Sequence, residues 1–91
     1  MELKELFEVV VEELESEDDH EEYNGICSMF QYFHYKDTNV VTWELIMKAK
    51  NMIKRYAPNH VKDDEGYFWP LTKIGKQKRI DFINNVILPK L

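Results

Sequence analysis

Apolar residues near the start of the chain recur at steps of three and four positions. The residues in this pattern are Leu3, Leu6, Phe7, Val10, Val11 and Leu14. Such a period places them on one face of a helix, with glutamates on the other faces. The pattern therefore predicts an amphipathic helix over about residues 2–15.

A second helix is predicted after the break at Asn24-Gly25. Ile26, Met29, Phe30 and Phe33 repeat at three and four residue steps, and the pattern ends near Tyr35. The high Tyr and Phe content leaves a strand as the alternative for this segment. Lys36-Asp37-Thr38-Asn39 has the composition of a turn.

Two further helices complete the predicted set. The third runs from about Val41 to Tyr56, and Pro58 forces the chain to leave it. Its inward positions are Trp43, Ile46, Ala49, Ile53 and Tyr56. The fourth follows Thr72, whose hydroxyl is suited to cap a helix start. Its apolar face is formed by Ile80, Ile83, Val86 and Ile87.

The segment between the last two helices is expected to be non-helical. Residues 59–66 are polar and read as a loop, whereas Tyr67-Phe68-Trp69-Pro70-Leu71 is expected to be extended because Trp69 precedes a proline. The sequence thus predicts a mostly α single domain over residues 1–91, with an acidic linker at about 16–23. Its predicted shared core is Leu6, Val10, Phe30, Ile46, Ile53, Trp69, Ile83 and Ile87.

Length and charge narrow the classes of function. With 91 residues the chain is too short for a doubly wound dinucleotide fold or a barrel enzyme. There are 17 acidic and 12 basic side chains, for a net charge of −5. Residues 1–22 hold 11 acids and one base, so the remaining residues carry a net positive charge. We expect opposed charged surfaces and no direct binding of nucleic acid.

Catalytic and metal-binding signatures are lacking in the sequence. Cys27 is the single cysteine, which excludes an internal disulfide and a paired-cysteine zinc site and suits the cytoplasm. Cys27 is expected to be a buried thiol, and the alternative is a nucleophile with His34 as its base. We expect no enzyme, metal or cofactor. Neither a signal peptide nor a membrane-spanning run is recognised.

The most specific chemical feature is a cationic segment that follows the aromatic one. Lys73, Lys76 and Arg79 recur every three residues from the start of the fourth helix. Helix-terminal N–H groups and cations attract anions, and an aromatic ring can stack on a nucleotide base. The predicted ligand-binding residues are Tyr67, Phe68, Thr72, Lys73, Lys76 and Arg79. The alternative is a solvated lysine face above core anchors Trp69 and Leu71.

Three short motifs carry a resemblance. They are Gly25-Ile26-Cys27, Tyr67-Phe68-Trp69-Pro70-Leu71, and Arg79-Ile80-Asp81-Phe82-Ile83 with Val86-Ile87. Over about residues 23–88 the chain resembles a group of small bacteriophage and prophage proteins. The resemblance implies a phage accessory protein that acts by binding in the host cytoplasm, through inhibition of a host defence enzyme or sequestration of its nucleotide signal. It implies no catalytic residue.

Two binding functions are therefore expected. In the first, the chain captures an anionic nucleotide-type molecule, as a homo-oligomer because so small a protomer has little room for a closed pocket. In the second, it is an acidic inhibitor that occupies a basic or DNA-binding surface of a host protein. The partner-binding residues of that alternative are Glu12, Glu13, Glu15, Glu17, Asp18 and Asp19.

Overall fold

The computed structural model is a small helical domain, and it describes residues 1–16, 26–56 and 73–91. Four α-helices follow one another in the chain: α1 (Leu3–Glu15), α2 (Ile26–Lys36), α3 (Trp43–Tyr56) and α4 (Lys73–Phe82). A π-helix, η2 (Ile83–Ile87), and a 3-10 turn, η3 (Leu88–Lys90), continue α4. The predicted helical fold class is confirmed, and the second segment is a helix rather than a strand. The predicted loop and extended segment at 59–71 lie outside the described residues.

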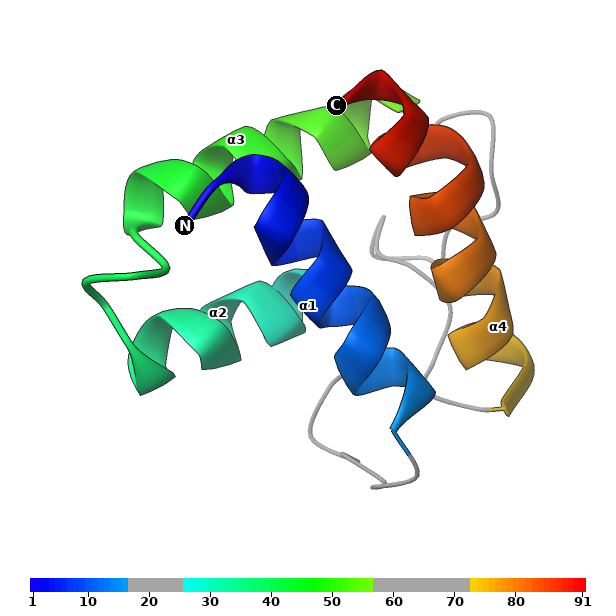
Figure 1. Ribbon diagram of the computed structural model, residues 1–91, viewed down its shortest axis with the longest axis horizontal. Helices are drawn as coiled ribbons and strands as arrows, with labels where there is room; N and C mark the ends of the chain where they lie inside the picture. The colour runs from blue at the N-terminus through cyan, green and yellow to red at the C-terminus, as the bar shows by residue number, and fades with distance from the viewer. Residues whose placement is uncertain (17–25, 57–72) are drawn as a thin grey trace.

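Helix α1 is the central element. It packs against α2, α3 and α4, and Figure 1 shows it running across the other helices. Its buried residues are Leu6, Phe7, Val10, Val11 and Leu14, the set that the apolar spacing predicts. Since each of the other helices contacts α1, its apolar face organises the whole core.

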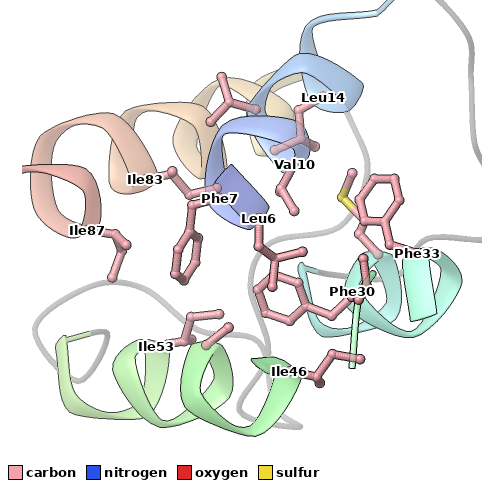
Figure 2. Close-up of a cluster of buried hydrophobic side chains, with 14 of the residues drawn as sticks. Leu6, Phe7, Val10, Leu14, Phe30, Phe33, Ile46, Ile53, Ile83 and Ile87 are labelled. Atoms are coloured by element: carbon pink, nitrogen blue, oxygen red, sulfur yellow. The ribbon is translucent and has the colours of Figure 1, made fainter. Parts of the chain in front are cut away.

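The core fills the space between these helices (Figure 2). Of the eight predicted core residues, all except Trp69 are buried, and Trp69 lies outside the described residues. The prediction that Trp43 points inward is wrong, because 51% of this residue is exposed. Tyr56 is half-buried at the edge of the core. None of the described helices is long and apolar enough to cross a membrane.

The connection between α2 and α3 is held by side-chain caps. The carboxylate Oδ1 of Asp37 accepts hydrogen bonds from the backbone N–H groups of Asn39, at 3.1 Å, and Val40, at 3.2 Å. Thr42 Oγ1 accepts one from the N–H of Leu45 at 3.2 Å. This cap satisfies a donor that the first turn of a helix leaves without a backbone partner. It explains why α3 begins at Trp43 and not at Val41.

The chain after α4 turns toward α3. The N–H of Leu88 bonds to the carbonyl of Ile83, which is the wider spacing of a π-helix. Pro89 then stands near the start of η3, where a missing N–H is tolerated. Ile83 and Ile87 are both fully buried, and η2 packs against α3. This route brings Lys90 to the end of α3.

Candidate functional site: a cationic groove beside α3

A surface groove of about 400 Å³ lies along the second half of α3. It is bordered by the start of α1 and by the residues that follow η2, and in Figure 1 both chain ends lie beside α3. The groove is lined by Leu3, Lys48, Asn51, Met52, Arg55, Tyr56, Lys90 and Leu91. Its volume falls in the range of small-molecule sites.

Helical spacing explains which α3 residues line the groove. Lys48, Met52 and Arg55 follow one another at steps of four and three, so they share one face of the helix. The neighbouring face carries the buried residues Ile46, Ala49 and Ile53. A polar and cationic flank therefore lies directly beside the apolar face that holds α3 to the core.

Tyr56 is the centre of the cationic part of the groove. The Nζ atom of Lys90 lies 4.7 Å from the centroid of the Tyr56 ring, and the Arg55 Cζ atom lies 5.5 Å from it. Both distances are within the range of cation–π contacts. The ring therefore gathers two cations that come from separate elements of the fold.

The described side chains that line the groove carry a net positive charge. Lys48, Arg55 and Lys90 are cations, and none of the described side chains that line the groove is acidic. Lys48 does form an ion pair with Glu44 at 3.9 Å, but both side chains are largely exposed and such pairs are weak. Cations in the last turn of a helix also stabilise its dipole, which accounts for Arg55. Lys48 and Lys90 lie outside the last turn of α3, so the helix dipole does not account for their positions.

Of the six ligand-binding residues predicted from the sequence, the structure describes the side chains of Lys76 and Arg79. Tyr67, Phe68 and Thr72 lie outside the described residues, as does the side chain of Lys73, although its backbone begins α4. Lys76 is half-buried. Among the described side chains, neither Lys76 nor Arg79 lines the groove. The role of all six residues in binding stays a prediction.

Arg79 is fully buried in the domain. Its Nε and Nη1 atoms are enclosed and donate no hydrogen bond, while the side chain as a whole does take part in an interaction. Removing a guanidinium from water is costly, so this position is a demanding one for an arginine. The regular cationic stripe expected from the sequence is broken here, because Arg79 lies inside the protein and not on its surface.

The acidic residues of the alternative site lie in part on α1. Glu12 and Glu15 are exposed and Glu13 is half-buried, whereas the residues at 17–19 lie outside the described part. Glu5 and Glu8 are exposed as well, at helical spacing with Glu12 and Glu15. We call Glu5, Glu8, Glu12 and Glu15 the acidic face of α1. No described cation forms an ion pair with these four residues.

Of the pair Cys27 and His34, the structure describes the side chain of His34. The side chain of Cys27 lies outside the described residues. His34 Nδ1 lies 2.7 Å from the carbonyl oxygen of Val41 and therefore donates a hydrogen bond to it. His34 thus anchors the connection to α3. Over residues 1–16, 26–56 and 73–91, no three metal-binding side chains come together.

The groove was not predicted from the sequence. The spacing of Lys48 and Arg55 was a usable signal, since residues seven apart share a helix face. The sequence gives no such signal for Lys90, because its approach to Tyr56 depends on the path of η2 and η3. No family model matches the chain, and neither a curated protein nor a solved structure is significantly similar to it.

Proposed function

We propose that this protein is a non-enzymatic binding protein that captures an anionic, ring-bearing small molecule of the nucleotide type in the α3 groove. The observation that carries the proposal is the pairing of Tyr56 with two cations, Arg55 and Lys90, at the edge of a groove with a third, Lys48. Phosphate oxygens bind such cations through charge-assisted hydrogen bonds. A base gains a ring to stack against.

The groove favours an anion over other ligands. Its apolar residues Leu3, Met52 and Leu91 supply contacts for a ring, while its three cations form a local positive charge on a protein that is acidic overall. Capture without turnover also suits the implied phage role, in which a small protein removes a nucleotide signal from its host receptor. That role is part of the proposal and rests on the resemblance of the sequence motifs alone.

The test is isothermal titration with a panel of linear and cyclic nucleotides, with inorganic phosphate and free nucleosides as comparisons. We expect heat from at least one nucleotide and weaker binding of the comparisons, because only the nucleotide supplies both a ring and charge. Lys48→Ala, Arg55→Ala and Lys90→Ala should each weaken binding by about fivefold to thirtyfold. Tyr56→Phe should retain binding and Tyr56→Leu should lose it.

Lys54→Ala is the matched control for these variants. Lys54 is exposed on the same helix, carries the same charge as Lys48 and does not line the groove. Its removal should leave nucleotide binding within twofold of wild type, as roughly expected for a screened distant charge. An equal loss in Lys54→Ala would show non-specific attraction, and a lack of heat from every nucleotide would reject the proposal.

A second function is favoured by the acidic face of α1. Its four glutamates are exposed on the side of α1 opposite the core and have no counter-ion among the described residues. Such a surface suits a basic partner, which would be drawn to it by long-range attraction. We propose as the alternative that this face occupies a basic surface of a host protein.

A lysine-rich helical peptide is a defined probe for this alternative. Wild-type protein should bind the peptide at low salt, and a variant with Glu8, Glu12 and Glu15 changed to Gln should associate more slowly and with less salt dependence. The variant should keep its helical circular dichroism. Equal association rates for the two proteins would show that the acidic face is only a solvated surface.

A further inference from the structure

Exposed apolar side chains gather where α2 meets α3. Tyr35 is 80% exposed and Trp43 is 51% exposed, and Val40 and Met47 are exposed beside them in the chain. We call Tyr35, Val40, Trp43 and Met47 the Trp43 surface. Trp, Tyr and Met are the residue types that protein interfaces favour, and exposed Trp is unusual on a small domain.

The Trp43 surface is continuous across two helices. The His34 ring lies between the two aromatic residues, with its centroid 5.9 Å from that of Tyr35 and 5.7 Å from that of Trp43. Met47 lies one helical turn beyond Trp43, on the same side of α3. The surface is therefore formed by α2, the connection and α3 together.

This surface is also held in place before any partner arrives. His34 is fixed by its hydrogen bond to the Val41 carbonyl, and Asp37 and Thr42 cap the connection. Lys50 Nζ lies 5.2 Å from the centroid of the Trp43 ring and limits its movement. Rigid aromatic side chains lose little conformational entropy on binding, which favours association.

Charge distinguishes this surface from the others. The basic residues beside it in the chain are Lys36, Lys48 and Lys50, and the acidic ones are Asp37 and Glu44, so this surface is bordered by charges of both signs. Glu44 pairs with Lys48 at 3.9 Å in an exposed ion pair. In contrast, the acidic face of α1 and the groove beside α3 each carry one sign of charge. A two-fold dimer places a surface against a copy of itself, so like charges would meet at either of those places. At the Trp43 surface the opposite charges of two copies can pair.

We propose that the Trp43 surface binds the same surface of a second copy of this chain in a two-fold symmetric dimer. The apolar side chains of the two copies form the centre of the interface, and Glu44 of each copy faces a lysine of the other at the rim. This places the acidic faces of α1 and the α3 grooves outside the interface. The dimer therefore does not depend on the function proposed for the groove.

Sedimentation velocity over a range from low to several hundred micromolar protein tests the proposal. The mass should rise with concentration from 11.0 kDa to twice that value and no further. Tryptophan emission should shift to shorter wavelength along with the mass, because Trp43 becomes buried. A chain that stays at 11.0 kDa throughout overturns the proposal.

Variants locate the interface. Trp43→Glu and Met47→Glu should each weaken dimerisation by about tenfold or more, as loss of a central interface residue does. Both positions are exposed in the single chain, so circular dichroism should show that the fold is kept. Asn84→Glu adds the same charge at an exposed position of η2, on the opposite side of the molecule from the α2–α3 connection (Figure 1), and should dimerise as wild type. A dimer unaffected by Trp43→Glu overturns the proposal.

Discussion

The rings of Phe7 and Phe30 meet edge to face at the centre of the core, with centroids 5.7 Å apart and planes at 82°. Both residues are fully buried (Figure 2). Edge-to-face contact is a favoured geometry of aromatic pairs, because the positive edge of one ring meets the negative face of the other. The pair joins α1 to α2.

Removal of either ring should therefore cost much of the stability of the domain. Phe7→Ala and Phe30→Ala should each lower the free energy of unfolding by about 3 to 5 kcal/mol, because each leaves a cavity. The double variant should lose less than the sum, by about 0.5 to 1.5 kcal/mol for the direct contact between the rings. Urea unfolding of the four proteins measures this coupling, and strictly additive losses would contradict it.

Burial of Arg79 leads to a second prediction about stability. Arg79→Ala should lower the free energy of unfolding by about 2 to 5 kcal/mol, as truncation of other long buried side chains does. Arg79→Met keeps most of the volume without the charge and should cost under about 1.5 kcal/mol. Lys78→Ala, at the exposed neighbouring position, should change it by about 0.5 kcal/mol or less. Thermal unfolding that is unchanged in Arg79→Ala would contradict this structural role.

The sequence was sufficient to predict the helices because their faces are regular. Leu6, Val10 and Leu14 keep the helical period without interruption, and all are buried. The same rule failed for Trp43, which stands at the first residue of α3 after the Thr42 cap. At that end the indole contacts His34 of α2 and Lys50 of α3 and stays 51% exposed.

For Arg79 the prediction was wrong in the opposite direction, because a residue expected at a binding surface is buried. It lies four residues before Ile83 and eight before Ile87, so its spacing places it on the buried face. The charge of Arg79 favours an exposed position, but its helical spacing to Ile83 and Ile87 indicates burial. The groove at Tyr56 could not be predicted in the same way, because Lys90 reaches that ring only through the π-helical turn of η2. Contacts between distant segments depend on the path of the chain, which local periodicity does not determine.

The cap of α3 gives a prediction with a matched pair of threonines. Thr42→Ala should lower the free energy of unfolding by about 1 kcal/mol, because the N–H of Leu45 loses the hydroxyl that accepts its hydrogen bond. Thr38→Ala removes the same group at an exposed position of the preceding turn and should have a smaller effect. Chemical denaturation of the two variants checks the difference. If both variants lost the same free energy of unfolding, the hydrogen bond from Leu45 to Thr42 would add no stability beyond that of an exposed threonine hydroxyl.

The acidic face of α1 allows the same substitution to be tested at both ends of one helix. Glu5 lies in the first turn, where the partial positive charge of the helix dipole stabilises a carboxylate, whereas Glu15 is the last residue of α1, where the dipole opposes it. Each of the two also has a like charge three residues away, Glu8 for Glu5 and Glu12 for Glu15, so this repulsion is matched and the dipole distinguishes the two ends. Glu5→Gln should therefore lower the free energy of unfolding, and Glu15→Gln should raise it, each by about 0.3 to 1 kcal/mol at low salt. Denaturation at low and high salt measures both shifts, which should shrink together as screening increases. Shifts of the same sign in the two variants would show that the total charge of the acidic face, and not its position along α1, sets the stability of the helix.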